Sequence, residues 1–79
     1  MKLKLTNTLG TPATDATVMV TEAPVDIHDI AAMADGTGSV NLADYVVPGK
    51  YTLVISYNGN SSIHTIDLTG ATEEIELTI

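Results

Sequence analysis

The sequence predicts an all-β fold, a seven-stranded antiparallel β-sandwich with Greek-key connections. Apolar and polar residues alternate with a period of two in several short segments, and clusters of turn-forming residues separate these segments. No segment carries a long helical pattern. The chain has 79 residues, which leaves room for one domain, residues 1–79, that hides roughly 60% of the surface exposed by its unfolded form.

The clearest β-pattern lies in residues 34–57. A turn at Gly38 can reverse the chain because glycine tolerates a positive φ, and the alternation in residues 39–42 then predicts a half-buried strand. Pro48 and Gly49 form the next corner, since proline lacks a donor and fixes its φ. The strand after this corner places four side chains on one face, which we expect to be core: Tyr51, Leu53, Ile55 and Tyr57.

Two strands are expected before this region, at residues 1–6 and 16–22. Between them lies a loop of Asn, Gly, Pro, Thr and Asp residues. Each strand has one apolar face, and Met19 is expected to cover a sheet margin. The side chains expected to face the core are Leu3, Leu5, Val18 and Val20.

Residues 23–34 allow two interpretations, because their apolar residues change phase near His28. The first is a loop or bulge at residues 28–29 followed by a strand at residues 30–34. The second is a short helix that begins at Pro24. We favour the loop and strand, since isolated helices this short are marginal and the flanking segments are all β-patterned.

Two further strands are expected in the C-terminal part, at residues 62–68 and 73–79. Asn58 and Gly59 predict a tight hairpin turn before the first of them. One face of this strand carries His64, Ile66 and Leu68, and the other carries Ile63, Thr65 and Asp67, so its phase is mixed near the start. The last strand has one apolar face, with Ile75, Leu77 and Ile79.

The first and last strands carry opposite charges on their solvent faces. Pairing them would place Lys2 and Lys4 opposite Glu74 and Glu76. Such exposed cross-strand pairs are each worth about 0.2 to 1 kcal/mol, so they bias the register more than the stability.

The composition excludes several classes of partner. The net charge is −7, and three lysines, Lys2, Lys4 and Lys50, are the only basic residues besides two histidines. Phosphate backbones and anionic lipids would be repelled, so we expect neither a nucleic-acid nor a membrane partner. The chain has no cysteine, hence no disulfide, and no apolar run of the ~20 residues that span a bilayer. The first ten residues lack the apolar stretch of a secretory signal, and the compartment stays open.

Three sequence blocks, at residues 10–18, 34–42 and 46–53, resemble in order those of the carboxypeptidase regulatory-like domain family. The resemblance implies a seven-stranded transthyretin-like (prealbumin-like) sandwich, with Tyr51 as its core tyrosine. It also implies a non-catalytic module of the kind found in enzymes, adhesins, transporters or secretion-spike proteins. Asp15 departs from the family pattern, which often has glycine there, and residues 23–29 resemble an insertion.

Two groups of residues have the chemistry of metal ligands. His28 lies between Asp26 and Asp29, and a fold that brought His64 beside them would create a divalent metal site. We favour a solvated polar turn for the first three, since the spacing is not diagnostic of a metal site, and His64 is expected to hydrogen-bond to backbone at a sheet edge. Asp35, Thr37, Ser39 and Asn41 alternate like calcium ligands, but the terminal glutamate of a calcium loop is missing, so turn chemistry explains them. We expect no cofactor.

The sequence does not predict an enzyme. Hydroxyisourate hydrolases, which share the transthyretin-like fold, use histidines with an arginine and a C-terminal Tyr-Arg-Gly-Ser segment, and this chain has neither the arginine nor that segment. No serine lies in a nucleophile elbow. A sugar platform is not expected either, since Tyr45 alone among the tyrosines is expected to be free for the surface.

The resulting hypothesis is a non-catalytic module that binds another protein, as a docking or spacer domain of a larger assembly. The surface expected to bind comprises residues 23–33 and the turn at residues 36–38, with the candidates Val25, Asp26, Ile27, His28, Asp29 and Thr37. Pairing of a partner strand with an unpaired sheet edge is a mode that sandwiches allow. The alternative is a small metal- or ligand-binding protein that uses His28 and His64. Oligomeric state cannot be read from these residues.

Overall fold

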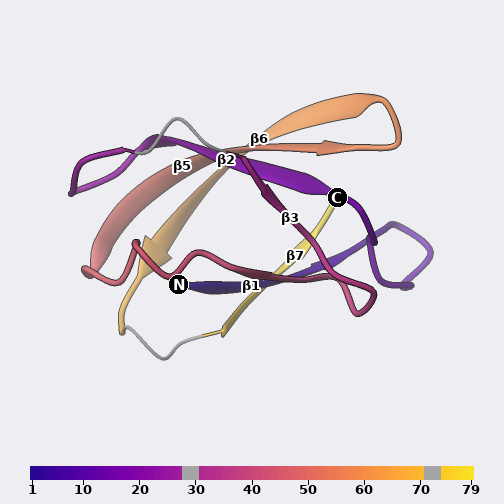
Figure 1. Ribbon diagram of the computed structural model, residues 1–79, viewed down its shortest axis with the longest axis horizontal. Helices are drawn as coiled ribbons and strands as arrows, with labels where there is room; N and C mark the ends of the chain where they lie inside the picture. Colours follow the sequence, from indigo (N-terminus) through magenta and orange to yellow (C-terminus); the bar gives the residue numbers. More distant parts are fainter. Residues whose placement is uncertain (28–30, 71–73) are drawn as a thin grey trace.

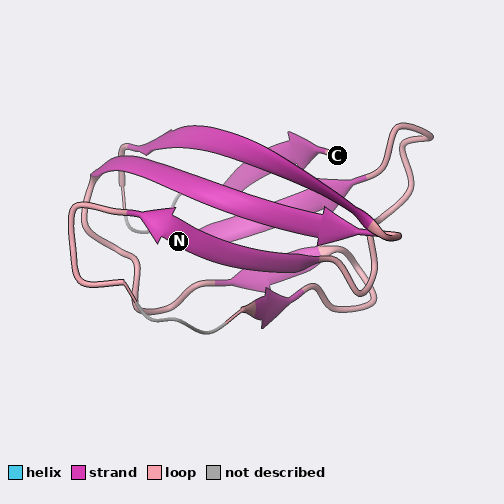
Figure 2. Cartoon of the chain, turned by 90° about the horizontal axis from the view of Figure 1, so that it is seen from above, coloured by secondary structure: helices cyan, strands magenta, loops and turns pink. Residues whose placement is uncertain are grey.

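The computed structural model describes residues 1–27, 31–70 and 74–79. These residues form strands and turns, with no helix, in two facing layers (Figures 1 and 2). No helix that could cross a membrane is found among them. The all-β prediction is confirmed, and the strands of the described residues are β1 (Lys2–Thr6), β2 (Thr17–Glu22), β3 (Ala32–Met33), β4 (Ser39–Asn41), β5 (Gly49–Tyr57), β6 (Asn60–Leu68) and β7 (Glu74–Thr78).

The strands form a three-stranded sheet in the order β4-β1-β7 and a four-stranded sheet in the order β3-β2-β5-β6. Every pair is antiparallel except β1 and β7, which run parallel. The prediction of a wholly antiparallel sandwich is therefore wrong at this pair. The alternation of side chains in β1 and β7 is the same for either direction, and a parallel pair needs only a long connection, which residues 7–73 supply.

The register of β1 and β7 agrees with the predicted charge pairing. Lys2 lies opposite Glu74 and Lys4 opposite Glu76, while Leu3 and Leu5 lie opposite Ile75 and Leu77. Because side chains alternate between the faces of a sheet, all four charged residues share the outer face. Charge pairing and core packing thus favour the same register.

The turns follow the residues that the sequence provides. Asn58 and Gly59 have φ values of 55° and 83°, as a two-residue hairpin turn of type I′ requires, and they connect Tyr57 to its partner Asn60. Gly38 has a φ of 79° and lies so close to β1 that a β-carbon there would collide with the Leu5 carbonyl oxygen. Asp15 has a φ of 64°, a conformation that glycine adopts without strain.

The core lies between the two sheets, and its most completely buried large side chains include Leu3, Leu5, Val18, Tyr51, Leu53 and Ile55. The Tyr51 hydroxyl donates a hydrogen bond to the Val47 carbonyl oxygen at 2.6 Å, which satisfies the one polar atom of this side chain. The predicted inward side chains of β1 and β2 are therefore confirmed, and so are Tyr51, Leu53 and Ile55 of β5. Tyr57, the last residue of β5, is only half-buried.

The expectation that Tyr45 is free for the surface is wrong. Tyr45 is 5% exposed and packs edge-to-face on Tyr51, with ring centroids 5.9 Å apart and planes at 83°. The N-terminal ammonium of Met1 donates to the carbonyl oxygens of Tyr45 and Leu42, at 2.7 and 3.0 Å, and so holds this loop against the core. An aromatic residue in a turn gives no periodic signal from which its burial could be predicted.

The ambiguous region contains a strand, as the favoured interpretation requires. Ala32 and Met33 pair with Val18 and Thr17 of β2. This strand is shorter than the predicted residues 30–34, and no helix is described in residues 23–27 or 31–34. The predicted loop or bulge at His28 and Asp29 lies outside the described residues.

Candidate docking site

The predicted binding surface is divided between two ends of the molecule. Val25 is half-buried against the core and Asp26 and Ile27 are exposed, all beyond the end of β2. Thr37 belongs to a turn near the beginning of β2, where the Ala34 amide donates to the Ala16 carbonyl oxygen at 2.7 Å. A strand of six residues separates these ends by roughly 17–20 Å. His28 and Asp29 lie outside the described residues.

The turn that contains Thr37 uses its carboxylate internally. Asp35 Oδ1 accepts hydrogen bonds from the Thr37 hydroxyl at 2.7 Å, the Thr37 amide at 2.8 Å and the Ser39 amide at 3.1 Å. These donors stabilise the ionised form and lower the pKa of Asp35, with the Thr37 hydroxyl as the main cause. Asp35 therefore orders the turn, as an aspartate commonly does at the start of a tight turn.

His64 contacts a side chain rather than the backbone, so that detail of the prediction is wrong. Its Nε2 atom lies 2.8 Å from the Ser62 hydroxyl, two residues earlier on the same face of β6. A nucleophilic serine needs a base that a third group orients, and no such hydrogen bond to His64 is found in the described part of the chain. Asp26 follows the far end of β2, and no three metal-binding side chains gather anywhere in the described ranges.

A different region has the properties of a docking site, namely the side of the sandwich where β6 and β7 are the outermost strands. Side chains of β1, β2 and β5 that point inward are almost all fully buried. The inward side chains of β7 and the residue after it are only partly buried, although they pack against the same core: Ile75, Leu77 and Ile79. The second sheet thus leaves β7 incompletely covered.

A hollow of about 540 Å³ opens at the end of this side. Ile55, Tyr57 and Ile79 give it apolar walls, and Ser62 gives it a polar wall. Leu9, which is 86% exposed, also lines it. Figure 1 shows the loop of residues 7–15, the β5–β6 hairpin and the C-terminus at this one end of the molecule. We call the hollow and the inward residues of β7 the open side.

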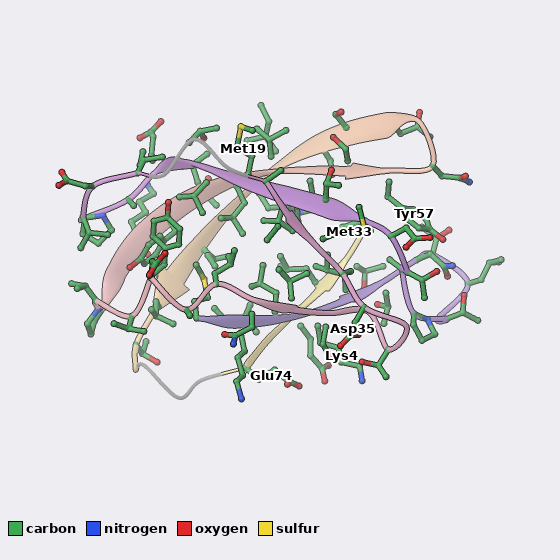
Figure 3. All side chains as sticks on the ribbon, viewed as in Figure 1. Lys4, Met19, Met33, Asp35, Tyr57 and Glu74 are labelled. Atoms are coloured by element: carbon green, nitrogen blue, oxygen red, sulfur yellow. The ribbon has the colours of Figure 1, made fainter. Side chains whose placement is uncertain are left out.

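The outer surface of the three-stranded sheet carries charged side chains beside the open side. Glu74 and Glu76 are exposed on β7, and across from them lie Lys2 and Lys4 of β1. Figure 3 shows Lys4 and Glu74 on the face of the molecule opposite Met19. The free edge of β7 is therefore flanked by carboxylates on the outside and by apolar side chains on the inside.

The outer face of the four-stranded sheet is different in character. Met19, Val54 and Ile63 lie side by side across β2, β5 and β6, and Ile63 is 74% exposed. Threonine and serine side chains surround this row. The expected position of Met19 at a sheet margin is wrong, since β2 lies inside its sheet. A second hollow, of about 340 Å³, lies between Ala32 and the loop at residues 42–45, and has the buried Leu42 and Tyr45 in its wall.

Neither the family models nor the curated proteins that were searched gave a match to this sequence.

Proposed function

We propose that this chain is a non-catalytic β-sandwich module that binds another protein through its open side, as a docking or spacer domain of a larger assembly. The incomplete burial of Ile75 and Leu77 on an outermost strand, and of Ile79 directly after it, carries this proposal. Full burial of one such side chain is worth about 1.5 to 3 kcal/mol relative to full exposure. A partner that covers them gains part of this free energy, and the neighbouring hollow offers a place for one of its side chains.

We also propose that the module belongs to the carboxypeptidase regulatory-like domain family, with its transthyretin-like Greek-key topology. Two observations support this. Tyr51, which follows the Pro-Gly corner of the third resembling block, is completely buried, as the core tyrosine of the family would be. In addition, Asp15 adopts a positive φ at the position where the family often has glycine.

Site-specific photo-cross-linking tests the docking proposal with a matched pair of positions on one strand. A benzoylphenylalanine in place of Ser62 would lie in the hollow, whereas one in place of Ile63 would point from the opposite face of β6. Irradiation in the native cell extract should give a discrete heavier adduct for the variant at Ser62 and not for the variant at Ile63. No adduct at Ser62, or equal adducts at both positions, would reject the hollow as part of the docking site.

A panel of divalent metal ions separates this function from the alternative, a small metal-binding protein that uses His28 and His64. A docking module should keep the same melting temperature with each metal. A rise in melting temperature that is lost in the His28→Ala variant and also in the His64→Ala variant would instead establish the metal-binding function. A metal that binds His64 through Nε2 would have to displace the Ser62 hydroxyl, which lies 2.8 Å from that atom.

A further inference from the structure

We propose that the free edge of β7 (Glu74–Thr78) binds an extended segment of the partner in which apolar residues alternate with lysine or arginine. The segment would extend the three-stranded sheet as a fourth strand. This inference rests on the proposed function and names the chemistry of the partner that the open side takes. It follows from three features of β7: an edge that pairs with no other described strand, a partly exposed inner face and an acidic outer face.

The edge of β7 is the most suitable of the four outer edges for an added strand. β3 has two residues and β4 has three, so both are too short to hold a partner firmly. The inward residues Ile66 and Leu68 of β6 are already buried. β7 has five residues, and its inward side chains remain partly exposed along the whole strand. An added strand would therefore bury more apolar surface at β7 than elsewhere.

The two faces of β7 determine which side chains an added strand needs. Neighbouring strands lie about 4.8 Å apart, and directly opposite side chains point to the same face. Inward side chains of the partner would meet Ile75 and Leu77, and outward ones would meet Glu74 and Glu76. Apolar residues suit the first pair and cations suit the second, so the two types must alternate.

The chain itself contains a strand of this pattern on the other side of β7. In β1, with the sequence KLKLT, Lys2 and Lys4 lie opposite the two glutamates, while Leu3 and Leu5 are completely buried. The bound partner would repeat this arrangement at the free edge. β7 would then lie between two strands of similar pattern, each contributing cations to the same acidic face.

A second copy of β7 does not fit this edge. Two β7 strands paired edge to edge would bring the glutamates of one copy beside those of the other, and like charges on facing strands are destabilising. Each copy also carries a net charge of −7. The glutamates thus disfavour self-pairing of the edge and favour a basic partner strand.

Three capped peptides with the wild-type protein test the inference. KVKVK has the proposed pattern, KKVVK has the same composition without alternation, and EVEVE has the alternation with the opposite charge. KVKVK should bind, and its binding should shift the amide NMR signals of β7 while those of β2 stay in place. KKVVK and EVEVE should bind at least about tenfold more weakly. Equal binding of KVKVK and KKVVK would mean a merely ionic attraction and would overturn the inference.

Backbone methylation of the peptide tests whether a strand forms. The amides of alternate residues in a strand point to opposite edges, so only one set can reach β7. Two methylated forms of KVKVK are compared, one methylated at the lysine amides and one at the valine amides. One of the two forms should lose binding, and the other should bind within about twofold of the unmethylated peptide. If both sets or neither set abolished binding, strand addition would be wrong.

Two protein variants test the acidic face with matched loss of charge. Glu74→Gln with Glu76→Gln removes both cross-strand partners and should weaken KVKVK binding by about two- to thirtyfold. Asp67→Asn with Glu22→Gln also removes two exposed carboxylates, both in the other sheet, and should change it by less than twofold. Equal effects would overturn the proposed recognition by the two glutamates.

If no peptide binds while the cross-link at Ser62 persists, strand addition is rejected and the docking function stands. If KVKVK binds but Ser62 gives no adduct, strand addition at β7 is supported, and binding of a cellular partner at the hollow is rejected.

Discussion

Gly38 shows how one residue determines the contact between two strands. Its positive φ and the Leu5 carbonyl oxygen leave no room for a β-carbon. Gly38→Ala should therefore lower the free energy of unfolding by about 2 to 4 kcal/mol. Gly36→Ala is the matched control, because no atom lies within 4 Å of a β-carbon there, and it should change stability by less than about 0.5 kcal/mol. Urea denaturation measures both, and similar losses would contradict the close approach.

Asp35 gives the turn before β4 a dependence on pH. Its hydrogen bonds from Thr37 and Ser39 lower its pKa in the folded protein below the ordinary value. The resulting stability is fully present above the pKa of the unfolded chain and is lost as the pH falls through the lower folded pKa. Asp35→Asn keeps the shape without the charge. Wild type should exceed this variant in stability at pH 7, and the difference should shrink below about pH 4. A difference that stays constant down to pH 2 would contradict this role.

At the scale of elements, the sequence predicts which residues form strands and which side chains face the core. This succeeds because a period of two identifies the faces of a strand regardless of what lies beside it. Alternation contains no information on strand direction, which is why the parallel pairing of β1 and β7 differs from the prediction. It also says nothing of Tyr45, whose burial depends on a loop that folds back onto Tyr51.

The register of β1 and β7 can be tested by exchanging charges. Lys4→Glu should destabilise the protein by about 0.2 to 1 kcal/mol, because two carboxylates would then lie opposite each other. Adding Glu76→Lys restores an opposite pair and should recover most of that loss. Adding Glu74→Lys instead leaves the two carboxylates at positions 4 and 76 facing each other and should recover less. Equal recovery in the two double variants, measured by urea denaturation, would contradict the register.

At the scale of the whole molecule, the proposed docking site has no signal in the sequence. The hollow brings together the loop before β2, the β5–β6 hairpin and Ile79, which no pattern within a single segment relates. The alternation of Ile75 and Leu77 predicts that they face inward, but their exposure depends on how far the opposite sheet reaches. The surface that was predicted proved to span two ends of the molecule, because Val25 and Thr37 flank β2 from opposite sides.

The position of β7 as an outermost strand with one free edge is central to this account. Amide hydrogen exchange of the monomer, followed by NMR, tests it most directly. In β1, which has a partner on both sides, consecutive amides from Leu3 to Leu5 should all be protected. In β7, protected and rapidly exchanging amides should alternate, because only every second amide faces β1. Protection of all consecutive amides in β7, or of none, would contradict the free edge and with it the docking site.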